Sequence, residues 1–489
     1  MDTSCLSKEQ KYAYDKFQRG DNLFITGPGG SGKTKLIQYF IDYAKQVKKT
    51  CQVCALTGCA SVLLNCGART IHSWSGIRIA RGPVDKIISS AIKSRKVASS
   101  WKKTKILIID EVSMMSQKIF ELLDELGRRI RNSPLPFGGI QVIFTGDFFQ
   151  LPPVGSDGEI ETEKFCFESP LWNRIFTPNN HIQLKTIFRQ TDPLYIDILS
   201  QIRKGVLDEK NIDLLKTYIK REYDTLKYDG ITPTKLFPTR NKADYVNSMM
   251  FEKLNEDEYE FEFATKKDCK TILDSGKSIS LEKLMECQRL SEKEKEQEIE
   301  RLINNTPCNR NLRLKKGASV ICTVNIDMDN SICNGSQGKV VDILDKGNVT
   351  VVIVKFLNGI VRPITPHFWQ SEDYPTIAIG QYPLALSWAL TIHKIQGATL
   401  AMAEIDIGLS VFEYGQTYVA LSRIQSLDGL YLSAFDPAKI RANPKVVEFY
   451  DTIPDIVFDE KIELNPFKNF ELKEDAYVEP DKNIKIIKI

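Results

Sequence analysis

The sequence lacks the features of membrane proteins and of strongly charged proteins. Among its 489 residues no run approaches the roughly 18 apolar residues of a membrane-spanning helix, and the longest, from Leu384 to Ile392, is interrupted by Ser387 and Thr391. The charge is balanced, because 66 basic residues stand against 63 acidic ones and leave a net charge of +3. We therefore expect no membrane partner, and any affinity for a polyanion must come from a local groove.

Targeting and metal-binding patterns are also missing. The start of the chain, Met1 to Cys5, has neither a basic-then-apolar secretory pattern nor an Arg-rich transit pattern. The 11 cysteines show no regular spacing, which is typical of reduced and mostly buried thiols. Cys51 and Cys54 could form half of a zinc site, but no second Cys pair or nearby His pair completes it. We expect an intracellular protein of the cytoplasm or nucleus.

Alternating strand and helix patterns in the first third of the chain predict an α/β domain. Four short β-rich runs, at 23–25, 52–55, 105–109 and 141–145, are separated by segments with helical spacing. This alternation is typical of a doubly wound parallel sheet with helices on both faces. Ligands bind at the carboxyl ends of the strands in such sheets, so we expect the polar residues that follow these runs to form the site.

A chain of this length predicts at least two domains, and its patterns indicate insertions within them. The first domain is expected at 1–177, with a basic insertion at about 77–100 that is either a solvated helix or a wedge facing a nucleic acid. The first part of a second α/β domain is expected at 178–313. Its segment at about 255–310 predicts a helical insertion, in which the charge run Glu292–Arg301 is expected to be a solvated face.

The pattern changes again after residue 313. Turn signals such as Asn334-Gly335 and Asn358-Gly359 separate short apolar runs at 314–383, which predicts a small antiparallel β module. The α/β pattern resumes at 384–440 and completes the second domain. A charged C-terminal tail is expected at 441–489.

One segment carries a specific phosphate-binding pattern. Gly27-Pro28-Gly29-Gly30-Ser31-Gly32-Lys33-Thr34 follows a predicted strand and precedes a predicted helix, as a phosphate loop requires. Its glycines allow backbone N–H groups to wrap the phosphates, Lys33 can reach the β- and γ-phosphates, and Thr34 can bind Mg²⁺. The sequence therefore predicts ATP and Mg²⁺. The expected nucleotide-binding residues of the loop are Gly27, Gly29, Gly30, Ser31, Gly32, Lys33 and Thr34.

Two further strands end in residues that suit hydrolysis. The apolar run before Asp110 and Glu111 delivers two carboxylates to the carboxyl end of a strand. Asp110 would hold Mg²⁺, and Glu111 would orient and deprotonate the attacking water. Gln150 follows the next strand and is placed to sense the γ-phosphate, although plain loop packing would explain the turn around it equally well. This combination favours hydrolysis over phosphoryl transfer to a metabolite.

These segments resemble the motifs of the Pif-type helicases of superfamily 1B, which are also similar to RecD-like helicases. The resemblance covers nearly the whole chain, and Asp110-Glu111-Val112-Ser113-Met114 matches one motif almost letter for letter. It implies two RecA-like motor domains, a wedge at about 77–100 and an SH3-like β-barrel at 314–383. By the same resemblance Gln10 reads the adenine and Gly397 belongs to the nucleotide site. Arg189 and Arg423 become arginine fingers, a role that the planar guanidinium suits.

The resemblance also implies a DNA path over both motor domains. The segments at 57–61, 67–73 and 391–397 are similar to the family's DNA-contacting motifs, although Leu56 and Ile395 replace the usual Pro and Ser. Hydroxyls, backbone amides and a few cations suit a phosphate backbone that is read without regard to sequence. The implied DNA-binding residues are Thr57, Gly58, Ser61, Thr70, His72, Phe148, Pro152, Thr239, Asn241, Thr391, His393, Lys394 and Gln396.

The resulting hypothesis is an ATP-hydrolysing DNA helicase that moves on single-stranded DNA, unwinds duplex or forked DNA and is a monomer in the free state. Roles in replication, repair or recombination, and the 5′-to-3′ polarity, come from the resemblance alone. An RNA-directed or non-unwinding translocase is the nearest alternative. A nucleotide kinase or signalling NTPase would not need the second arginine or the 391–397 motif, and a single-strand-binding protein would not need Lys33 and Glu111.

Overall fold

The four strands expected in the first third of the chain lie in one parallel sheet. In the computed structural model this sheet has six strands in the order β3-β2-β4-β5-β1-β6. The bounds match the predicted runs to within one residue for the four strands that were expected, so the doubly wound α/β prediction is confirmed here. The strands are β1 Leu23–Thr26, β2 Cys51–Ala55, β3 Arg69–Thr70, β4 Ile106–Asp110, β5 Gln141–Gly146 and β6 His181–Gln183.

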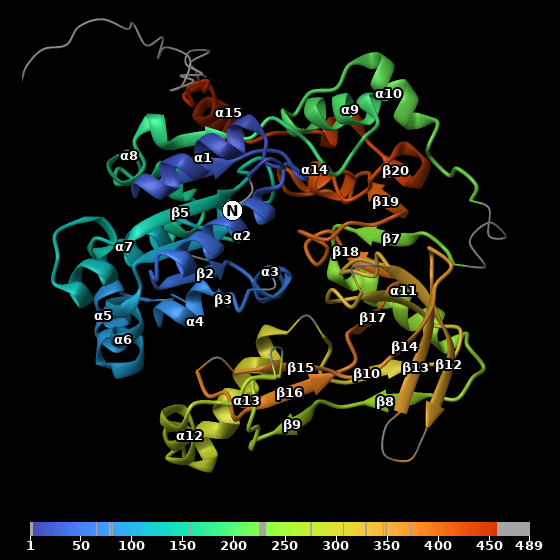
Figure 1. The fold of residues 1–489 in the computed structure, drawn as a ribbon. Coiled ribbons are helices and arrows are strands. Elements are labelled where there is room, and N and C mark those ends of the chain that lie inside the picture. The colour runs from blue at the N-terminus through green and yellow to red at the C-terminus, as the bar shows by residue number, and fades with distance from the viewer. Residues whose placement is uncertain are drawn as a thin grey trace, which may run out of the picture. The chain divides into compact units, whose positions relative to one another are not determined.

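Helices pack against this sheet through their apolar faces. In α2, Leu36, Ile37, Phe40, Ile41 and Ala44 recur at helical spacing and are buried. The α1 helix begins at a capping box, in which the Ser7 side chain accepts from the Gln10 backbone N–H and the Gln10 side chain accepts from the Ser7 N–H. Figure 1 shows these elements in blue and teal. The helices are α1 Lys8–Arg19, α2 Lys33–Gln46, α3 Gly58–Leu63, α4 Ile71–Ser75, α7 Gln117–Arg131 and α8 Trp172–Ile175.

The structure describes residues 3–64, 66–77, 80, 82–156, 158–223, 231–273, 276–306, 308–327, 330–345, 347, 350–371 and 373–456. Within the expected insertion at 77–100, residues 78, 79 and 81 lie outside this set. Most of its other residues lie in the helices α5 Val84–Lys93 and α6 Arg95–Lys103. Ile88 of α5 and Trp101 of α6 are buried. The insertion is therefore a packed helical pair. Among the described residues, no helix is both long enough and apolar enough to cross a bilayer.

The expected domain boundary at 177/178 falls too early. β6 pairs in parallel with β1, so it belongs to the first sheet and not to the second domain. The second parallel sheet has the order β18-β7-β19-β20. Two of the predicted segments, the insertion at about 255–310 and the module at 314–383, interrupt this sheet in sequence. Of its four strands, only β7 precedes them. These elements are β7 Thr234–Phe237, β18 Ala389–Thr391, β19 Ala403–Ile407 and β20 Leu430–Phe435, with α9 Pro193–Arg203, α10 Glu209–Lys216, α11 Arg240–Glu252 and α14 Gln416–Leu421.

The antiparallel module is present, but its limits differ from those predicted. Its five strands have the order β14-β13-β12-β11-β17, and β17 at Leu384–Leu386 carries it past residue 383. The expected helical insertion also contains strands: β8 pairs with β10 in a two-stranded sheet, and β9 pairs with β16 in a three-stranded sheet, both separate from the module. The elements are β8 Tyr259–Phe261, β9 Ala264–Lys266, α12 Leu281–Gln288, α13 Glu292–Asn305, β10 Leu312–Leu314, β11 Ser319–Cys322, β12 Gln337–Asp345, β13 Thr350–Phe356, β14 Val361–Ile364, β15 His367–Gln370 and β16 Ala378–Gln381.

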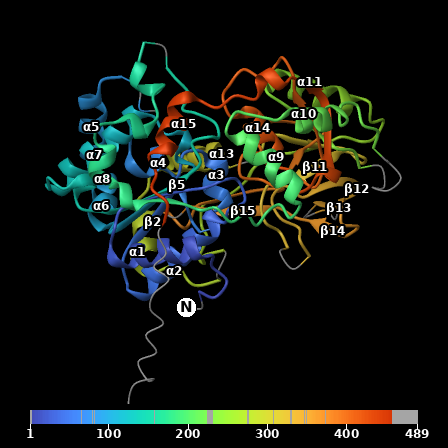
Figure 2. The ribbon, with the colours of Figure 1, turned by 90° about the horizontal axis from the view of Figure 1, so that it is seen from above.

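The segment after residue 440 is not simply a charged tail. The helix α15, Pro444–Asp451, returns to the first sheet, where Phe449 stacks on Phe167 with 4.3 Å between ring centroids. The Tyr450 hydroxyl accepts from the Phe148 backbone N–H at 3.2 Å. Figures 1 and 2 both show this red helix among the blue and teal elements. The rest of the predicted tail, 457–489, lies outside the described residues.

His181 in β6 provides a pH test of this core. Its Nε2 accepts from Trp172 Nε1 at 3.1 Å, and burial lowers its pKa to about 4. The unfolded chain, with a pKa of about 6.5 at this residue, binds more protons between these values. The free energy of unfolding should therefore fall by up to about 3 kcal/mol as the pH falls from 6.5 to 4.

Urea unfolding across this pH range measures the effect. His181→Gln should remove most of the slope that His181 causes, because glutamine does not titrate. A comparison at pH 7.5, where His181 is neutral in both states, gives the cost of the substitution itself. An undiminished slope in His181→Gln would assign the pH dependence to other groups.

Candidate functional site

The predicted phosphate loop connects β1 to α2 at the carboxyl edge of the first sheet. Gly30 has a φ of +88°, and a Cβ there would lie 2.5 Å from Arg189 Cβ, so both conformation and space require glycine. Lys33 Nζ donates to the carbonyls of Gly27 at 2.7 Å and Pro28 at 3.1 Å. Thr34 is exposed in the first turn of α2. The loop therefore places backbone donors, a lysine and a helix N-terminus together, which suits a phosphate chain.

Gln10 braces this loop. Its Nε2 donates to Ser31 O at 3.2 Å and Gly32 O at 3.4 Å, while its Oε1 accepts from the Ser7 N–H at 3.0 Å. The whole side chain is buried. Both ends of the amide are thus engaged within the chain. The structure brings Gln10 to the nucleotide loop as expected, and its contact with adenine stays a prediction.

Two carboxylates, the buried Asp110 and the half-buried Glu111, lie at the carboxyl end of β4. Asp110 Oδ1 accepts a hydrogen bond from Thr145 Oγ1. Glu111 lies at a φ of +55°, an uncommon conformation for a residue with a side chain. Burial raises the pKa of both groups, and Asp110 raises that of Glu111 further, whereas Lys33 opposes both shifts. A cation would favour the charged forms, and oxygen donors from Thr34 and Asp110 fit the hard ligands that Mg²⁺ prefers.

Gln396 lies beside the predicted catalytic residues, and its contact with DNA stays a prediction. Its Nε2 donates to Glu111 Oε2 at 3.2 Å and to Gln150 Oε1 at 3.5 Å. Gln150 is itself buried at the end of the loop that follows β5. The sequence assigned Gln396 to DNA through the motif around it, but the structure shows it touching the predicted catalytic carboxylate.

Arg189 and Arg423 both reach the phosphate loop. A Cβ on Gly29 would lie 3.4 Å from Arg423 Nη2 and 3.5 Å from Arg189 Nη1. Arg423 Nε donates to Val419 O at 2.9 Å, and Arg189 Nη1 donates to Ser422 O at 3.0 Å. Burial lowers the pKa of each arginine, and the positive charge of Arg423 lowers that of Arg189 further. A buried cation, Arg423, and a half-buried one, Arg189, lie beside one glycine and form a site that an anion would stabilise.

The two arginines come from different domains. Arg423 follows α14 and belongs to the second domain, as expected. Arg189 follows β6 of the first sheet, and the N–H of its neighbour Phe188 donates to Gly30 O at 2.8 Å. The backbone beside Arg189 is therefore fixed to the phosphate loop. This corrects the expectation that both arginines lie on the second domain.

A buried cluster around Asp147 was not among the predicted site residues. Arg203 donates to both carboxylate oxygens of Asp147, and its shortest contact is 2.8 Å. Tyr418 Oη and Tyr450 Oη lie 3.3 and 3.2 Å from the same carboxylate. Tyr418 Oη also accepts from the Gly29 N–H at 2.9 Å. The cluster thus connects the phosphate loop to α9, α14 and α15, a connection that no local sequence pattern could show.

The predicted DNA residues of the first domain gather at the ends of β2 and β3. The Thr57 hydroxyl accepts from the Ala60 N–H at 3.2 Å, and the Thr70 hydroxyl accepts from the Ser73 N–H at 3.3 Å, so both threonines also cap the helices that follow. Gly58 starts α3, and Ser61 is buried and donates to Gly58 O. Burial lowers the pKa of His72, which favours its neutral form.

Those of the second domain follow β7 and β18, which are neighbours in the sheet. Thr239 and Asn241 follow β7, and Thr391, His393 and Lys394 follow β18. Parallel neighbours place these two groups at one edge. Asn241, His393 and Lys394 are exposed there, as is Gly397, whose role at the nucleotide stays a prediction.

Phe148 cannot contact DNA in this conformation. Its side chain is 1% exposed and packs among Phe24, Phe165, Phe167 and Trp172. The prediction of a DNA contact at Phe148 is therefore corrected to a core position, because the aromatic ring fills the space between β1 and α8. Pro152, four residues later, is half-buried.

Comparisons with known proteins agree with this geometry. The model of the PIF1-like helicases matches residues 5–212, and that of the 2B domain of the DNA helicase Pif1 matches residues 299–343. The ATP-dependent DNA helicase PIF1 of Emericella nidulans is 34% identical in a match that covers 88% of this chain and 61% of that protein. The chain thus spans about three fifths of that relative's length.

Solved structures are similar over most of the chain. The crystal structure of Pif1 helicase from Candida albicans is 32% identical with a TM-score of 0.69, and the match covers 92% of this chain and 99% of that one. A crystal structure of Bacteroides Pif1 in complex with ADP-AlF3 and single-stranded DNA is 27% identical with a TM-score of 0.58, and covers 91% of this chain and 96% of that one.

The Asp147 cluster gives a stability prediction. Asp147→Asn removes the negative charge that Arg203 needs in a site where Asp147 is fully buried and Arg203 is 7% exposed. Breaking one partner of a buried ion pair leaves an uncompensated charge, so the free energy of unfolding should fall by about 3 kcal/mol or more. Urea unfolding at pH 7 measures the loss.

The matched control is Asp213→Asn, which removes the same charge from an exposed pair with Lys216. It should change the free energy of unfolding by less than about 0.5 kcal/mol. If the two variants have the same free energy of unfolding, the ion pair of Asp147 contributes no more to the stability of the fold than the exposed pair of Asp213.

Proposed function

This chain belongs to the PIF1-like helicase family, and we propose that it hydrolyses ATP to move along single-stranded DNA and to separate DNA strands with 5′-to-3′ polarity. The relative from Emericella nidulans is called an ATP-dependent DNA helicase, and the Bacteroides Pif1 helicase was solved with ADP-AlF3 and single-stranded DNA. The polarity rests on the family resemblance of the motifs. A second candidate is translocation on RNA, or translocation without strand separation, and either would use the same nucleotide site.

The observation that carries the proposal is the position of Arg189 and Arg423 beside Gly29. A phosphate loop alone would serve any NTPase. Two arginines that reach it from two different domains would make the γ-phosphate part of the interface between these domains. Loss of the γ-phosphate would leave these cations without an anion, and this would release the domains from each other.

The remaining roles at the nucleotide follow from the contacts of each residue. Lys33 would neutralise the β- and γ-phosphates, and Glu111 would orient and deprotonate the attacking water. Gln150 and Gln396 contact each other beside Glu111, so both are placed to sense the γ-phosphate. Thr34 and Asp110 would hold Mg²⁺, which supplies positive charge to the phosphates when bound.

Coupling to DNA follows from the segment that contains Gln396. His393 and Lys394 are exposed beside the predicted DNA path, and Gln396 reaches Glu111 two residues later. A change at the nucleotide therefore has a direct route to the residues proposed to hold the strand. Thr57 and Thr70 on the first domain and Thr391 on the second would hold the strand alternately as the cleft opens and closes.

We further infer the finer parts of the architecture from the same resemblance. The five-stranded module around β12 and β13 would be an SH3-like barrel, and the α5–α6 pair would act as the wedge at a fork. The free chain would be a monomer. Lys86 and Lys93 on α5 supply the positive charge that a wedge beside duplex DNA needs.

A strand-displacement assay tests the proposed function. Labelled duplexes with a 5′ tail, a 3′ tail or no tail, made of DNA or RNA, are mixed with the chain, ATP and Mg²⁺. We expect ATP-dependent separation of the 5′-tailed DNA alone, together with stimulation of ATP hydrolysis by single-stranded DNA. Lys33→Ala, which lacks the charge on the phosphates, is the inactive control. Absence of single-strand stimulation in the unmodified chain would eliminate the motor.

Arg423→Ala should separate binding from movement. The substitution removes a cation from the phosphate loop but lies away from the predicted DNA path, so the affinity for single-stranded DNA should stay within about twofold of the original. Turnover of ATP should fall by about 10³-fold and unwinding should stop, as for the loss of an arginine finger. Fluorescence anisotropy measures the binding, and phosphate release measures the turnover.

Arg441→Ala is the matched control, because Arg441 is an exposed arginine of the same domain that stacks on Tyr414. It should leave turnover and unwinding nearly unchanged. Rapid unwinding by Arg423→Ala would remove this arginine from the engine.

A further inference from the structure

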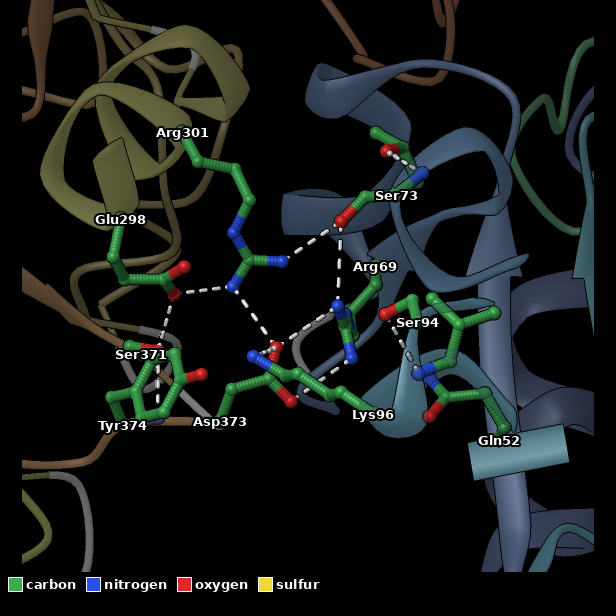
Figure 3. Close-up of polar contacts among 12 residues, drawn as sticks. Gln52, Arg69, Ser73, Ser94, Lys96, Glu298, Arg301, Ser371, Asp373 and Tyr374 are labelled. Atoms are coloured by element: carbon green, nitrogen blue, oxygen red, sulfur yellow. Dashed lines mark hydrogen bonds and ion pairs between the residues drawn. The ribbon is translucent and has the colours of Figure 1, made fainter. Parts of the chain in front are cut away.

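A group of charged side chains joins the first domain to the insertion between β7 and β18, which contains α13, β15 and β16. Asp373, in the loop between β15 and β16, accepts from Arg69 at the start of β3, with Nη1 at 3.2 Å and Nη2 at 3.0 Å. Lys96 Nζ on α6 lies 2.8 Å from Asp373 Oδ2, and Arg301 Nη2 on α13 lies 3.2 Å from the same oxygen. Figure 3 shows the three cations converging on this one carboxylate.

The cluster is partly buried, which distinguishes it from an ordinary surface ion pair. The side chains of Arg69 and Asp373 are each 14% exposed, and that of Lys96 is 39% exposed. Glu298 is a second carboxylate of the cluster, and it accepts from Arg301 and from Ser371 Oγ. The predicted solvated face at Glu292–Arg301 is thus wrong for Glu298 and Arg301. The charges sum to three cations and two anions.

The position of the cluster matters because it adjoins the predicted DNA path. Arg69 directly precedes Thr70, and Ser73 directly follows His72. Ser73 Oγ accepts from Arg301 Nη1 at 2.8 Å and from Arg69 Nη2 at 3.4 Å, as Figure 3 shows. The insertion therefore contacts the first domain at Arg69 and Ser73, which lie next to the predicted DNA contacts Thr70 and His72. Lys96 adds a cation from the expected wedge.

We propose that Arg69, Lys96 and Arg301 form a binding site for a backbone phosphate of single-stranded DNA, and that Asp373 occupies this site until the strand displaces it. This inference rests on the proposed function, because it assumes that DNA follows the path beside Thr70 and His72. It adds two elements to that function, namely a phosphate site and a segment of the chain that competes for it.

The chemistry of the exchange supports the proposal. A phosphodiester carries one negative charge, as Asp373 does, so the exchange conserves the charge balance of the three cations. The guanidinium of Arg69 already binds both oxygens of a carboxylate, and the same two-pronged geometry binds two phosphate oxygens. Ser73 supplies a hydroxyl at the same place. Because Asp373 and the phosphate need the same donors, DNA binding would separate the insertion from the first domain.

The first test uses Asp373→Asn, which keeps the shape of the side chain and removes its charge. The dissociation constant of a fluorescein-labelled oligo(dT) is measured by anisotropy at about 0.15 M salt, where exposed charges more than roughly 8 Å apart are largely screened. The variant should bind about fivefold more tightly, because the strand no longer has to displace a carboxylate.

Glu300→Gln is the matched control. It removes one negative charge from α13, next to Arg301 in sequence, but Glu300 pairs with Arg310, outside the cluster. Its dissociation constant should stay within about twofold of that of the unmodified chain. If Asp373→Asn binds no more tightly than Glu300→Gln, the competition does not exist and the proposal is overturned.

A second test remains decisive even if Asp373→Asn fails to fold. Lys96→Gln changes a side chain that is 39% exposed, and it should lower the slope of log affinity against log salt by about 1, since one phosphate contact is lost. An unchanged slope would overturn the phosphate site. In the Asp373→Asn background the same substitution should weaken binding more than in the unmodified chain, because only the DNA contact is then lost.

Failure of the proposed function gives a different result. A chain that neither binds oligo(dT) nor hydrolyses ATP faster in its presence would refute the motor, and this inference with it. A chain that is stimulated normally by DNA, but in which Asp373→Asn and Lys96→Gln have no effect, would refute this inference alone.

Discussion

The buried carboxylate of Asp147 is the contact on which the arrangement of the nucleotide site depends. It lies at the end of β5 and is held by Arg203, Tyr418 and Tyr450, which come from three helices far apart in the sequence. A buried charge of this kind is tolerated only when its partners are all in place. Because Tyr418 also accepts from the N–H of Gly29, the same contact connects the phosphate loop to the second domain.

Through that connection, the proposed hydrolysis of ATP would act on both domains. Arg423 directly follows the C-cap of the short helix α14, which contains Tyr418, so the arginine is held beside the loop next to an element that contacts Asp147. On the opposite side, Arg189 sits on a segment bonded to the loop itself. Gln396 then extends the site toward exposed His393 and Lys394. A few short segments in direct contact therefore join the nucleotide site to the proposed DNA path.

The insertion adds a second set of charges with a different character. In the Asp147 cluster Asp147 is fully buried and Arg203 is 7% exposed, whereas in the Asp373 cluster Lys96 is 39% exposed. A dry ion pair stabilises one arrangement, while a half-exposed one can exchange partners at small cost. The buried charges of the Asp147 cluster thus hold the nucleotide site in one arrangement. The accessible charges of the Asp373 cluster lie where the chain is proposed to rearrange on DNA.

The sequence by itself determined the local chemistry: the strands before each polar cluster, the phosphate loop, and the paired Asp110 and Glu111. These depend on neighbouring residues and on periodicity, which a linear sequence records. The tertiary structure decided what depends on distant partners, namely the transfer of β6 to the first sheet, the burial of Phe148, the docking of α15, and the meeting of Gln396 with Glu111. No spacing along the chain encodes such contacts, because they form only when sheets and insertions pack together.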